Sequence, residues 1–197
     1  VPAVYPPVAQ GLFALVSSVR PDSELAMKLL FFAFDIGPMS VLVWILRRMR
    51  RPPEAVLVYA WSPLIVKEFA NSAHLDTIGI FFLVLTVAAW IQSRPLGVAA
   101  GWTMALLSKY FPIVLFPLFA RRMGWRGAGM VLMMCAGAFA PFLFWLDTDG
   151  AAGIGGTFSG FVTFGKEWTF NAGLFRILEF FIGAQPERAV GAELVKL

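Results

Sequence analysis

Long apolar runs separated by short polar clusters form the pattern of this chain. The clearest run covers residues 24–46 and is followed by four arginines within residues 47–51. Because a helix of about 20 apolar residues crosses a hydrocarbon layer, this run predicts a membrane-spanning helix. Residues 8–19 are apolar but too few to cross upright, so they predict a short or partly submerged helix. Between the two runs, residues 20–23 predict a polar turn with a helix cap.

Basic clusters between the runs predict which helix ends share one side of the membrane. Lys and Arg are enriched in cytoplasmic loops, so the arginines of residues 47–51 should lie inside. Arg94 and the cluster at residues 121–126 should lie inside as well. This arrangement requires residues 54–69 to run outward and residues 75–91 to run back.

Residues 96–120 contain the most informative break in the pattern. A single crossing by this run would place the basic cluster that follows it outside, against the positive-inside rule. The sequence Ser-Lys-Tyr-Phe-Pro at residues 108–112 interrupts the run, and proline disrupts the hydrogen bonding of a helix. We therefore expect a re-entrant hairpin of two half-helices. Residues 127–146 then lead outward to a glycine-rich segment.

The composition favours lipid as the solvent. Of the 197 residues, 59% are hydrophobic and 14% are charged, whereas a soluble domain is about half apolar and about a quarter charged. We expect an all-α fold, a polytopic transmembrane helical bundle with short and re-entrant helices. Residues 1–197 are expected to form a single transmembrane domain fragment, an internal piece of a longer chain. The net charge of +4 comes from clusters between apolar runs, so nucleic acid is not an expected partner.

Polar residues concentrate on the expected outer side of the membrane. They are Tyr5, Glu68, Asn71, His74, Asp76, Lys109, Tyr110, Asp147, Asp149, Lys166, Glu167 and Asn171. Ionisable groups at membrane depth are costly unless they pair, face water or bind a ligand. This convergence indicates a binding or catalytic site.

Lys109 is the most specific candidate in that set, because it interrupts an apolar run beside Pro112. Its positive charge suits a phosphate group. The alternative is a structural role, in which the side chain snorkels to the interface or pairs with Glu68.

The outer turn that contains Glu68, Asn71, His74 and Asp76 has several interpretations. These residue types ligate metals, accept protons or hold sugar hydroxyls, but no known ligand spacing is present. Helix capping by Asn71 or Ser72 and an interfacial role for His74 are the structural alternatives. We expect no metal site and no cofactor, and leave open a divalent cation, Mg²⁺ or Mn²⁺.

Residues within the apolar runs have mainly structural interpretations. Asp35 lies in the middle of its run, where it either lines a cavity or, as we favour, bonds to a neighbouring helix. Six tryptophans are typical of the belts at membrane interfaces, with the last one also a candidate for stacking on a sugar. They are Trp61, Trp90, Trp102, Trp125, Trp145 and Trp168.

Four short motifs follow one another across nearly the whole chain. They are Tyr-Pro-Pro-Val-Ala-Gln at residues 5–10, Tyr-Ala-Trp-Ser-Pro-Leu at residues 59–64 leading to Glu68 and to His-Leu-Asp at residues 74–76, Leu-Ser-Lys-Tyr-Phe-Pro at residues 107–112, and Glu-Trp-Thr-Phe-Asn at residues 167–171. In order and spacing these motifs resemble the GT-C class of membrane glycosyltransferases. The resemblance is greatest to the bacterial polyprenol-phosphate-mannose-dependent mannosyltransferases related to the GPI mannosyltransferase catalytic subunit.

The resemblance implies an enzyme that transfers a sugar from a polyprenyl-phosphate donor to a glycan or glycolipid acceptor. It also implies an integral protein of the bacterial inner membrane whose active face is outward. Lys109 and Tyr110 would bind the donor phosphate. The sugar or acceptor would contact Tyr5, Glu68, Asn71, His74, Asp76, Lys166, Glu167 and Asn171. The catalytic acidic residue of such enzymes is expected upstream of residue 1, so no catalytic residue is assigned.

A transporter or lipid-carrier flippase is the alternative from another class. Half-helices broken at proline near an ionisable residue also occur in secondary transporters. Such transporters usually have repeated halves and polar residues through the membrane, whereas this chain has polar groups on one expected side and no fixed-period repeat. The enzyme is therefore the favoured interpretation.

Overall fold

The computed structural model describes residues 4–71, 74–144, 159–160 and 162–163. All regular elements in these ranges are helical, so the predicted all-α class is confirmed for this part of the chain. The chain divides into two compact units, Tyr5–Asp147 and a second unit that contains Thr148–Leu197. Ser159, Gly160, Val162 and Thr163 of the second unit are helical. The prediction of one domain stays a prediction, and the remaining description concerns the first unit.

Helices α1 (Pro7–Val19) and α2 (Glu24–Arg48) correspond to the first two apolar runs. Pro7 occupies the first helical position of α1, where a missing N–H costs no hydrogen bond. The Ser23 hydroxyl caps α2 by accepting a hydrogen bond from the main-chain N–H of Ala26, at 3.3 Å. The predicted turn and cap are therefore confirmed.

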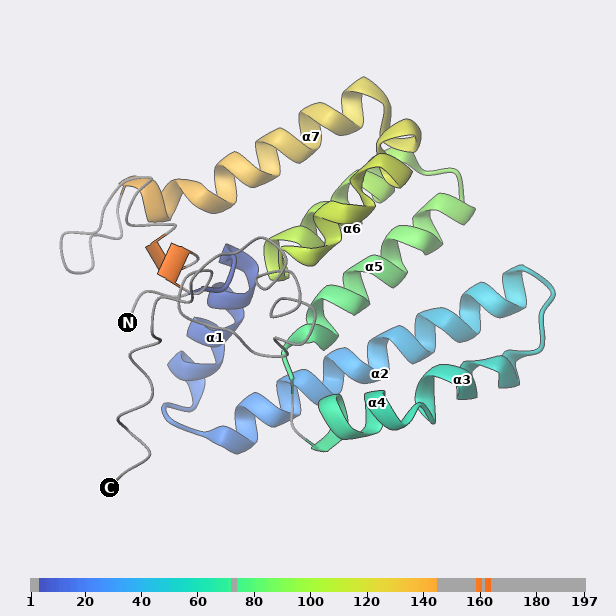
Figure 1. Cartoon of the computed structure of the whole chain (residues 1–197), viewed down its shortest axis with the longest axis horizontal. Coiled ribbons are helices and arrows are strands. Elements are labelled where there is room, and N and C mark those ends of the chain that lie inside the picture. Colours follow the sequence, from blue (N-terminus) through green and yellow to red (C-terminus); the bar gives the residue numbers. More distant parts are fainter. Residues whose placement is uncertain (1–3, 72–73, 145–158, 161, 164–197) are drawn as a thin grey trace, which may run out of the picture. The chain divides into compact units, whose positions relative to one another are not determined.

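The chain then returns along α2 as a series of short pieces (Figure 1). These are η1 (Pro53–Val56), α3 (Leu57–Ala60), α4 (Pro63–Ile65) and the π-helical segment η2 (Val66–Asn71). The direction agrees with the outward run expected for residues 54–69. The segment is broken because Pro53 and Pro63 each open a new piece and cannot donate a main-chain hydrogen bond.

Helix α5 (Asp76–Ile91) lies beside α2 and runs parallel to it (Figure 1). Gly37 of α2 permits this approach, since a Cβ atom there would lie 2.7 Å from the ring of Phe81. The ring of Phe34 packs against that of Phe81, with the centroids 5.5 Å apart. Because the two helices are parallel, their arginine-flanked carboxyl ends share one end of the unit.

Helix α6 (Pro95–Ser108) runs back beside α5, and the chain reverses again through η3 (Phe111–Leu115). The indole N–H of Trp102 donates a hydrogen bond to the main-chain carbonyl of Pro112, at 2.9 Å. A buried cluster joins Val98, Ala99 and Trp102 of α6 to Phe119 and Met123 further along. The reversal predicted for residues 108–112 is thus present in the backbone.

Helix α7 (Phe116–Phe144) contains a second reversal, at Gly124 (Figure 1). Gly124 has φ 62° and ψ −175°, a conformation that glycine adopts without a Cβ clash. The following turns bring Met130 and Val131 back onto the cluster that contains Trp102 and Phe119. Residues before and after Gly124 therefore run in opposite directions.

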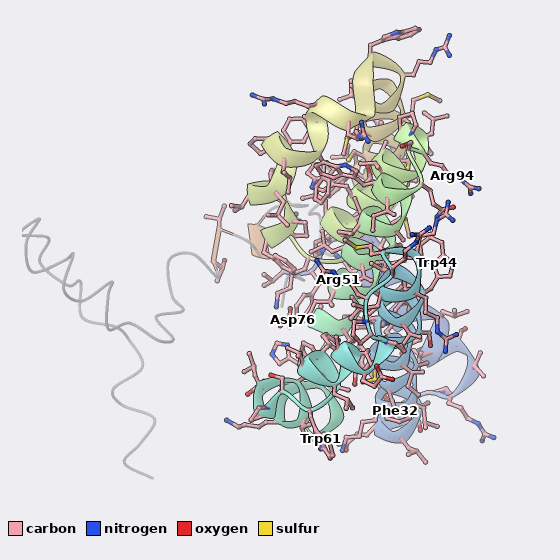
Figure 2. The ribbon with its side chains drawn as sticks, turned by 90° about the vertical axis from the view of Figure 1, so that its right-hand side faces the viewer. Phe32, Trp44, Arg51, Trp61, Asp76 and Arg94 are labelled. Atoms are coloured by element: carbon pink, nitrogen blue, oxygen red, sulfur yellow. The ribbon has the colours of Figure 1, made fainter. Side chains whose placement is uncertain are left out.

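Apart from Asp35, which is buried in the middle of α2, the charged residues of these helices lie toward their two ends. One end, the arginine end, carries Arg47, Arg48, Arg50, Arg51, Arg94, Arg121, Arg122 and Arg126. Figure 2 looks onto this end, where Arg51 and Arg94 are labelled. Asp76 begins α5 at the opposite end, the polar end. By length and composition, two helical stretches of the described chain are long and apolar enough to cross a membrane, Glu24–Arg48 and Phe111–Phe144. The second contains the reversal at Gly124, so it does not run in one direction throughout.

Candidate functional site

A three-residue polar cluster occupies the polar end, where α5 begins and α6 ends. Lys109 Nζ donates to Asp76 Oδ1, and His74 Nδ1 lies 2.8 Å from Asp76 Oδ2. One carboxylate thus contacts a lysine and an imidazole with its two oxygens. Three of the residues predicted to bind substrate or phosphate are therefore adjacent.

Gly79 lies where the start of α5 meets the end of α6. It lies three residues after Asp76, on the same side of α5. A Cβ atom at Gly79 would lie 3.4 Å from the ring of Phe111 and 3.9 Å from Cβ of Lys109. Both distances are ordinary van der Waals contacts. The close approach of the two helices depends on Gly101 of α6 instead, where a Cβ atom would lie 2.6 Å from Oγ1 of Thr86 in α5. The sequence analysis missed Gly79, whose signal was a glycine within one turn of a candidate carboxylate.

The end of α6 positions Lys109. The helix stops at Ser108, and Lys109 is extended, with φ −156° and ψ 145°. Its main-chain N–H still donates to the carbonyl of Ala105, at 3.0 Å. Trp102 holds the reversal from the other side through its bond to Pro112.

Trp102 corrects one expectation. This tryptophan is 3% exposed and belongs to the buried cluster, so its assignment to an interfacial belt was wrong. Its indole N–H bonds to a carbonyl that the break at Pro112 leaves outside a regular helix. Its position, ten residues before that proline, is the signal that the sequence offered.

The cluster is open on one side. The side chains of Asp76 and Lys109 are 27% and 32% exposed, so a ligand in solution or in a lipid headgroup layer can reach both. Behind them, Leu75 and Thr77 are buried. Tyr110, at the break between the helices, is half-buried, and that burial raises the pKa of its hydroxyl. A protonated phenol beside Lys109 can donate to an anion.

Glu68 pairs with Lys67 and not with Lys109. Its carboxylate, which is 33% exposed, lies 3.6 Å from Nζ of the exposed Lys67, whereas Lys109 pairs with Asp76. The alternative in which Lys109 pairs with Glu68 was therefore wrong. The main-chain carbonyl of Glu68 accepts from the N–H of His74, at 2.9 Å, so this turn still orients His74.

Other predicted residues contribute less to the cluster. The ring of Tyr5 packs edge-on against Phe13 of α1, and its carbonyl accepts from the side chain of Gln10 at 2.6 Å. Asn71 ends η2. Helix α5 has Leu75 at its N-cap position, without a side-chain cap hydrogen bond. Ser72 lies outside the described residues, so capping of this turn stays a prediction. Five predicted residues lie outside the described residues: Asp147, Asp149, Lys166, Glu167 and Asn171.

Asp35 is a structural residue. Its side chain is 3% exposed and accepts a hydrogen bond from the Tyr59 hydroxyl, at 3.0 Å. Because Tyr59 comes from the returning segment, this bond connects α3 to α2. The favoured interpretation of Asp35, a buried carboxylate bonded to a neighbouring element, is confirmed.

No group of three or more His, Cys, Asp or Glu side chains suited to a metal ion occurs within the described ranges. What the site offers instead is a cation held by a carboxylate, an imidazole on the same carboxylate, and an open side. This arrangement can bind an anion and hold hydroxyl groups near it. Comparison with family models, curated proteins and solved structures finds no match.

Proposed function

We propose that the chain is part of a GT-C type membrane glycosyltransferase that uses a polyprenyl-phosphate sugar donor. The cluster of Lys109, Asp76 and His74 is the observation that carries the proposal. The cluster combines an accessible cation with groups that bind hydroxyls, and it lies at a helix break. A sugar phosphate requires a cation for its phosphate and hydrogen-bonding groups for its hydroxyls.

The proposal includes a membrane arrangement. The arginine end faces the cytoplasm and the polar end faces outward, because basic residues are retained on the cytoplasmic side. In this arrangement α2 crosses the membrane, and α6 with residues 111–123 forms a re-entrant hairpin within a polytopic bundle. The proposed location is the bacterial inner membrane, with the cluster open to the outer face.

Lys109 has the central role in the proposed reaction. As the bond between the anomeric carbon and the phosphate oxygen breaks, negative charge grows on the departing phosphate. An ammonium group at hydrogen-bond distance stabilises that charge more in the transition state than in the bound donor. Tyr110 lies next to Lys109 in sequence, where its phenol would donate a second hydrogen bond.

Asp76 and His74 have positioning roles in this scheme. Asp76 holds Lys109 in place before the donor binds, so that less side-chain entropy is lost on binding. His74, on the other carboxylate oxygen, is exposed and free to orient a sugar or acceptor hydroxyl. The acceptor oxygen forms the new bond to the anomeric carbon. The group that takes the acceptor's proton is left unassigned.

Sugar transfer by the complete protein in detergent, with a radiolabelled polyprenyl-phosphate sugar as donor, tests the proposal. Lys109→Ala should lower kcat/KM about 100-fold, the size of effect expected when one preorganised charge is lost. Lys109→Arg keeps a cation and should recover part of the activity. Lys67→Ala is the matched control, because Lys67 is 75% exposed and pairs with Glu68 instead.

Two results would contradict the proposal. Unchanged turnover in Lys109→Ala would remove Lys109 from the mechanism. Movement of the labelled donor across vesicle membranes without any sugar transfer would favour the transporter or flippase.

A further inference from the structure

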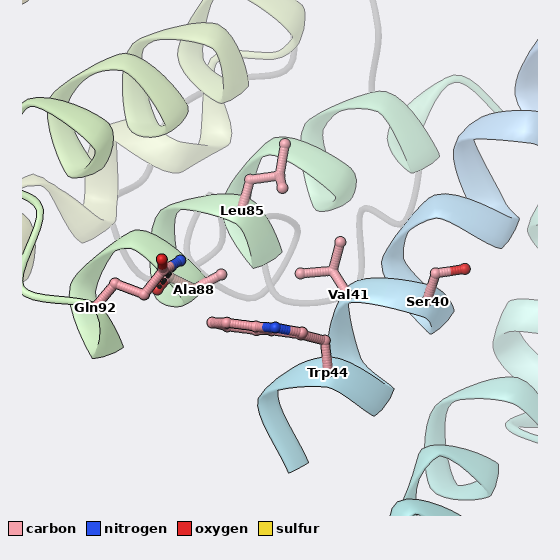
Figure 3. A pocket seen from close by; sticks show the side chains of 6 residues that line it. All are labelled: Ser40, Val41, Trp44, Leu85, Ala88 and Gln92. Carbon is pink, nitrogen blue, oxygen red and sulfur yellow. Dashed lines mark hydrogen bonds between the residues drawn. The ribbon is translucent and has the colours of Figure 1, made fainter. Parts of the chain in front are cut away.

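A groove lies between α2 and α5 near the arginine end (Figure 3). Its volume is about 300 Å³, roughly ten times the share of one molecule in liquid water. Six residues line it: Ser40, Val41, Trp44, Leu85, Ala88 and Gln92. The groove is therefore large enough to hold part of a long, flexible ligand molecule. It adjoins the carboxyl ends of both helices, away from Lys109.

The lining of this groove is apolar in effect. The Ser40 hydroxyl donates to the carbonyl of Ile36, and the Gln92 amide donates to the carbonyl of Ala88. Both polar side chains thus bond within their own helices, as the dashed line in Figure 3 marks for Gln92. The rest of the lining is mostly hydrocarbon, together with the indole of Trp44. An apolar chain is the occupant that such a surface favours.

Positive charge lies at the mouth of the groove. Arg47 and Arg48 follow Trp44 by three and four residues, which places them on its side of α2. Arg94 comes two residues after Gln92, in the exposed turn that ends α5. In the part of the chain that the structure describes, none of these three arginines forms an ion pair. Glu54, six residues after Arg48, is exposed, and the described part of the chain shows no ion pair for it.

We propose that this groove binds an anionic glycerophospholipid, with one acyl chain along Val41, Trp44 and Leu85 and the phosphate on Arg47 and Arg48. An apolar slot beneath unpaired arginines complements both parts of such a lipid. The inference rests on the membrane arrangement proposed above, in which these arginines face the inner leaflet. It does not depend on sugar transfer, because the groove and the cluster at Lys109 are at opposite ends.

Quenching of Trp44 fluorescence by lipids brominated on the acyl chain tests the inference. The complete protein is reconstituted in vesicles that contain either brominated phosphatidylglycerol or brominated phosphatidylcholine. Subtracting the signal of Trp44→Phe in each background isolates Trp44 from the other tryptophans. Half-maximal quenching should require a roughly tenfold lower mole fraction of the anionic lipid than of the zwitterionic lipid.

Variants that remove arginine charges distinguish a specific lipid site from general attraction between the protein and anionic lipids. Arg47→Gln with Arg48→Gln should abolish the preference for the anionic lipid. The matched control, Arg121→Gln with Arg126→Gln, removes the same charge from the same end but away from the groove, and should keep the preference. Equal loss in both double variants would show diffuse attraction and overturn the inference. Equal quenching by both lipids in the wild type would overturn it as well.

A steric variant tests the position of the acyl chain. Val41→Phe fills the groove and should reduce quenching of Trp44 by both lipids, while Arg47 and Arg48 are retained. Unfolding temperature in detergent confirms that this variant folds. Unchanged quenching would show that the chain lies elsewhere. Sugar transfer measured on the same samples reports on the proposed enzyme separately, since neither result requires the other.

Discussion

Lys109 and Asp76 form an ion pair although 33 residues separate them in the chain. Lys109 follows the last residue of α6, and Asp76 is the first residue of α5. The two helices pack closely because Gly101 of α6 leaves room for Thr86 of α5, whose Oγ1 would lie 2.6 Å from a Cβ atom at that position. Helix packing, rather than charge, thus determines where Lys109 and Asp76 meet.

This pair predicts a measurable coupling in stability. Lys109→Met and Asp76→Asn should each lower the free energy of unfolding by about 1–3 kcal/mol, because each leaves a partly buried group without its charged partner. The double variant should lose less than the sum of the two. Denaturant unfolding in detergent measures the three values.

The pair of Lys67 and Glu68, in which the lysine is 75% exposed, provides the control for that cycle. Its atoms are 3.6 Å apart on the surface, so Lys67→Met and Glu68→Gln should change stability little and show little coupling. Additive losses for Lys109 and Asp76 would contradict their interaction.

Tyr59→Phe should destabilise the protein by about 1–3 kcal/mol. It removes the hydroxyl that donates to Asp35 and leaves a buried carboxylate without this partner. Asp35→Asn keeps an oxygen acceptor and should cost less. Thermal unfolding in detergent compares the two, and Tyr5→Phe is a control at an exposed tyrosine. A loss in Tyr5→Phe as large as in Tyr59→Phe would contradict the role of this bond.

Gly124→Ala should lower the free energy of unfolding by about 1–3 kcal/mol, because φ 62° and ψ −175° are unfavourable for any residue with a Cβ atom. No neighbouring atom lies within 4 Å of such a Cβ, so the loss would come from the backbone alone. Gly129→Ala, also in open space but within the helix, should instead raise stability by about 0.5–1 kcal/mol. Unfolding measurements in which both substitutions act alike would contradict a reversal at Gly124.

The membrane arrangement predicts the sidedness of single cysteines. In a Cys135→Ala background, Arg94→Cys and Arg121→Cys should react with an impermeant thiol reagent from the cytoplasmic side. Lys67→Cys should react from the outer side. Labelling in right-side-out and inverted vesicles measures this. External reactivity of Arg121→Cys would exclude the re-entrant hairpin, and Lys109 would then lie within an ordinary span.

Local sequence by itself determined the helices and most of their breaks. The length of the apolar runs, the serine cap before α2 and the prolines at residues 53, 63 and 112 act through neighbouring residues. Such effects can be predicted because capping and the loss of a proline N–H depend on a few adjacent peptide units. The distribution of arginines similarly indicated which helix ends lie together.

Only the tertiary structure decided which side chains meet. Residue types alone allowed Lys109 to pair with either Glu68 or Asp76, and the packing of α6 against α5 brought it to Asp76. Packing of η3 against α6 buried Trp102, and the return of α3 along α2 gave Asp35 its partner Tyr59. These contacts join residues far apart in the chain, and they depend on helix register and side-chain volume. Neither quantity is contained in a local pattern of apolar and polar positions.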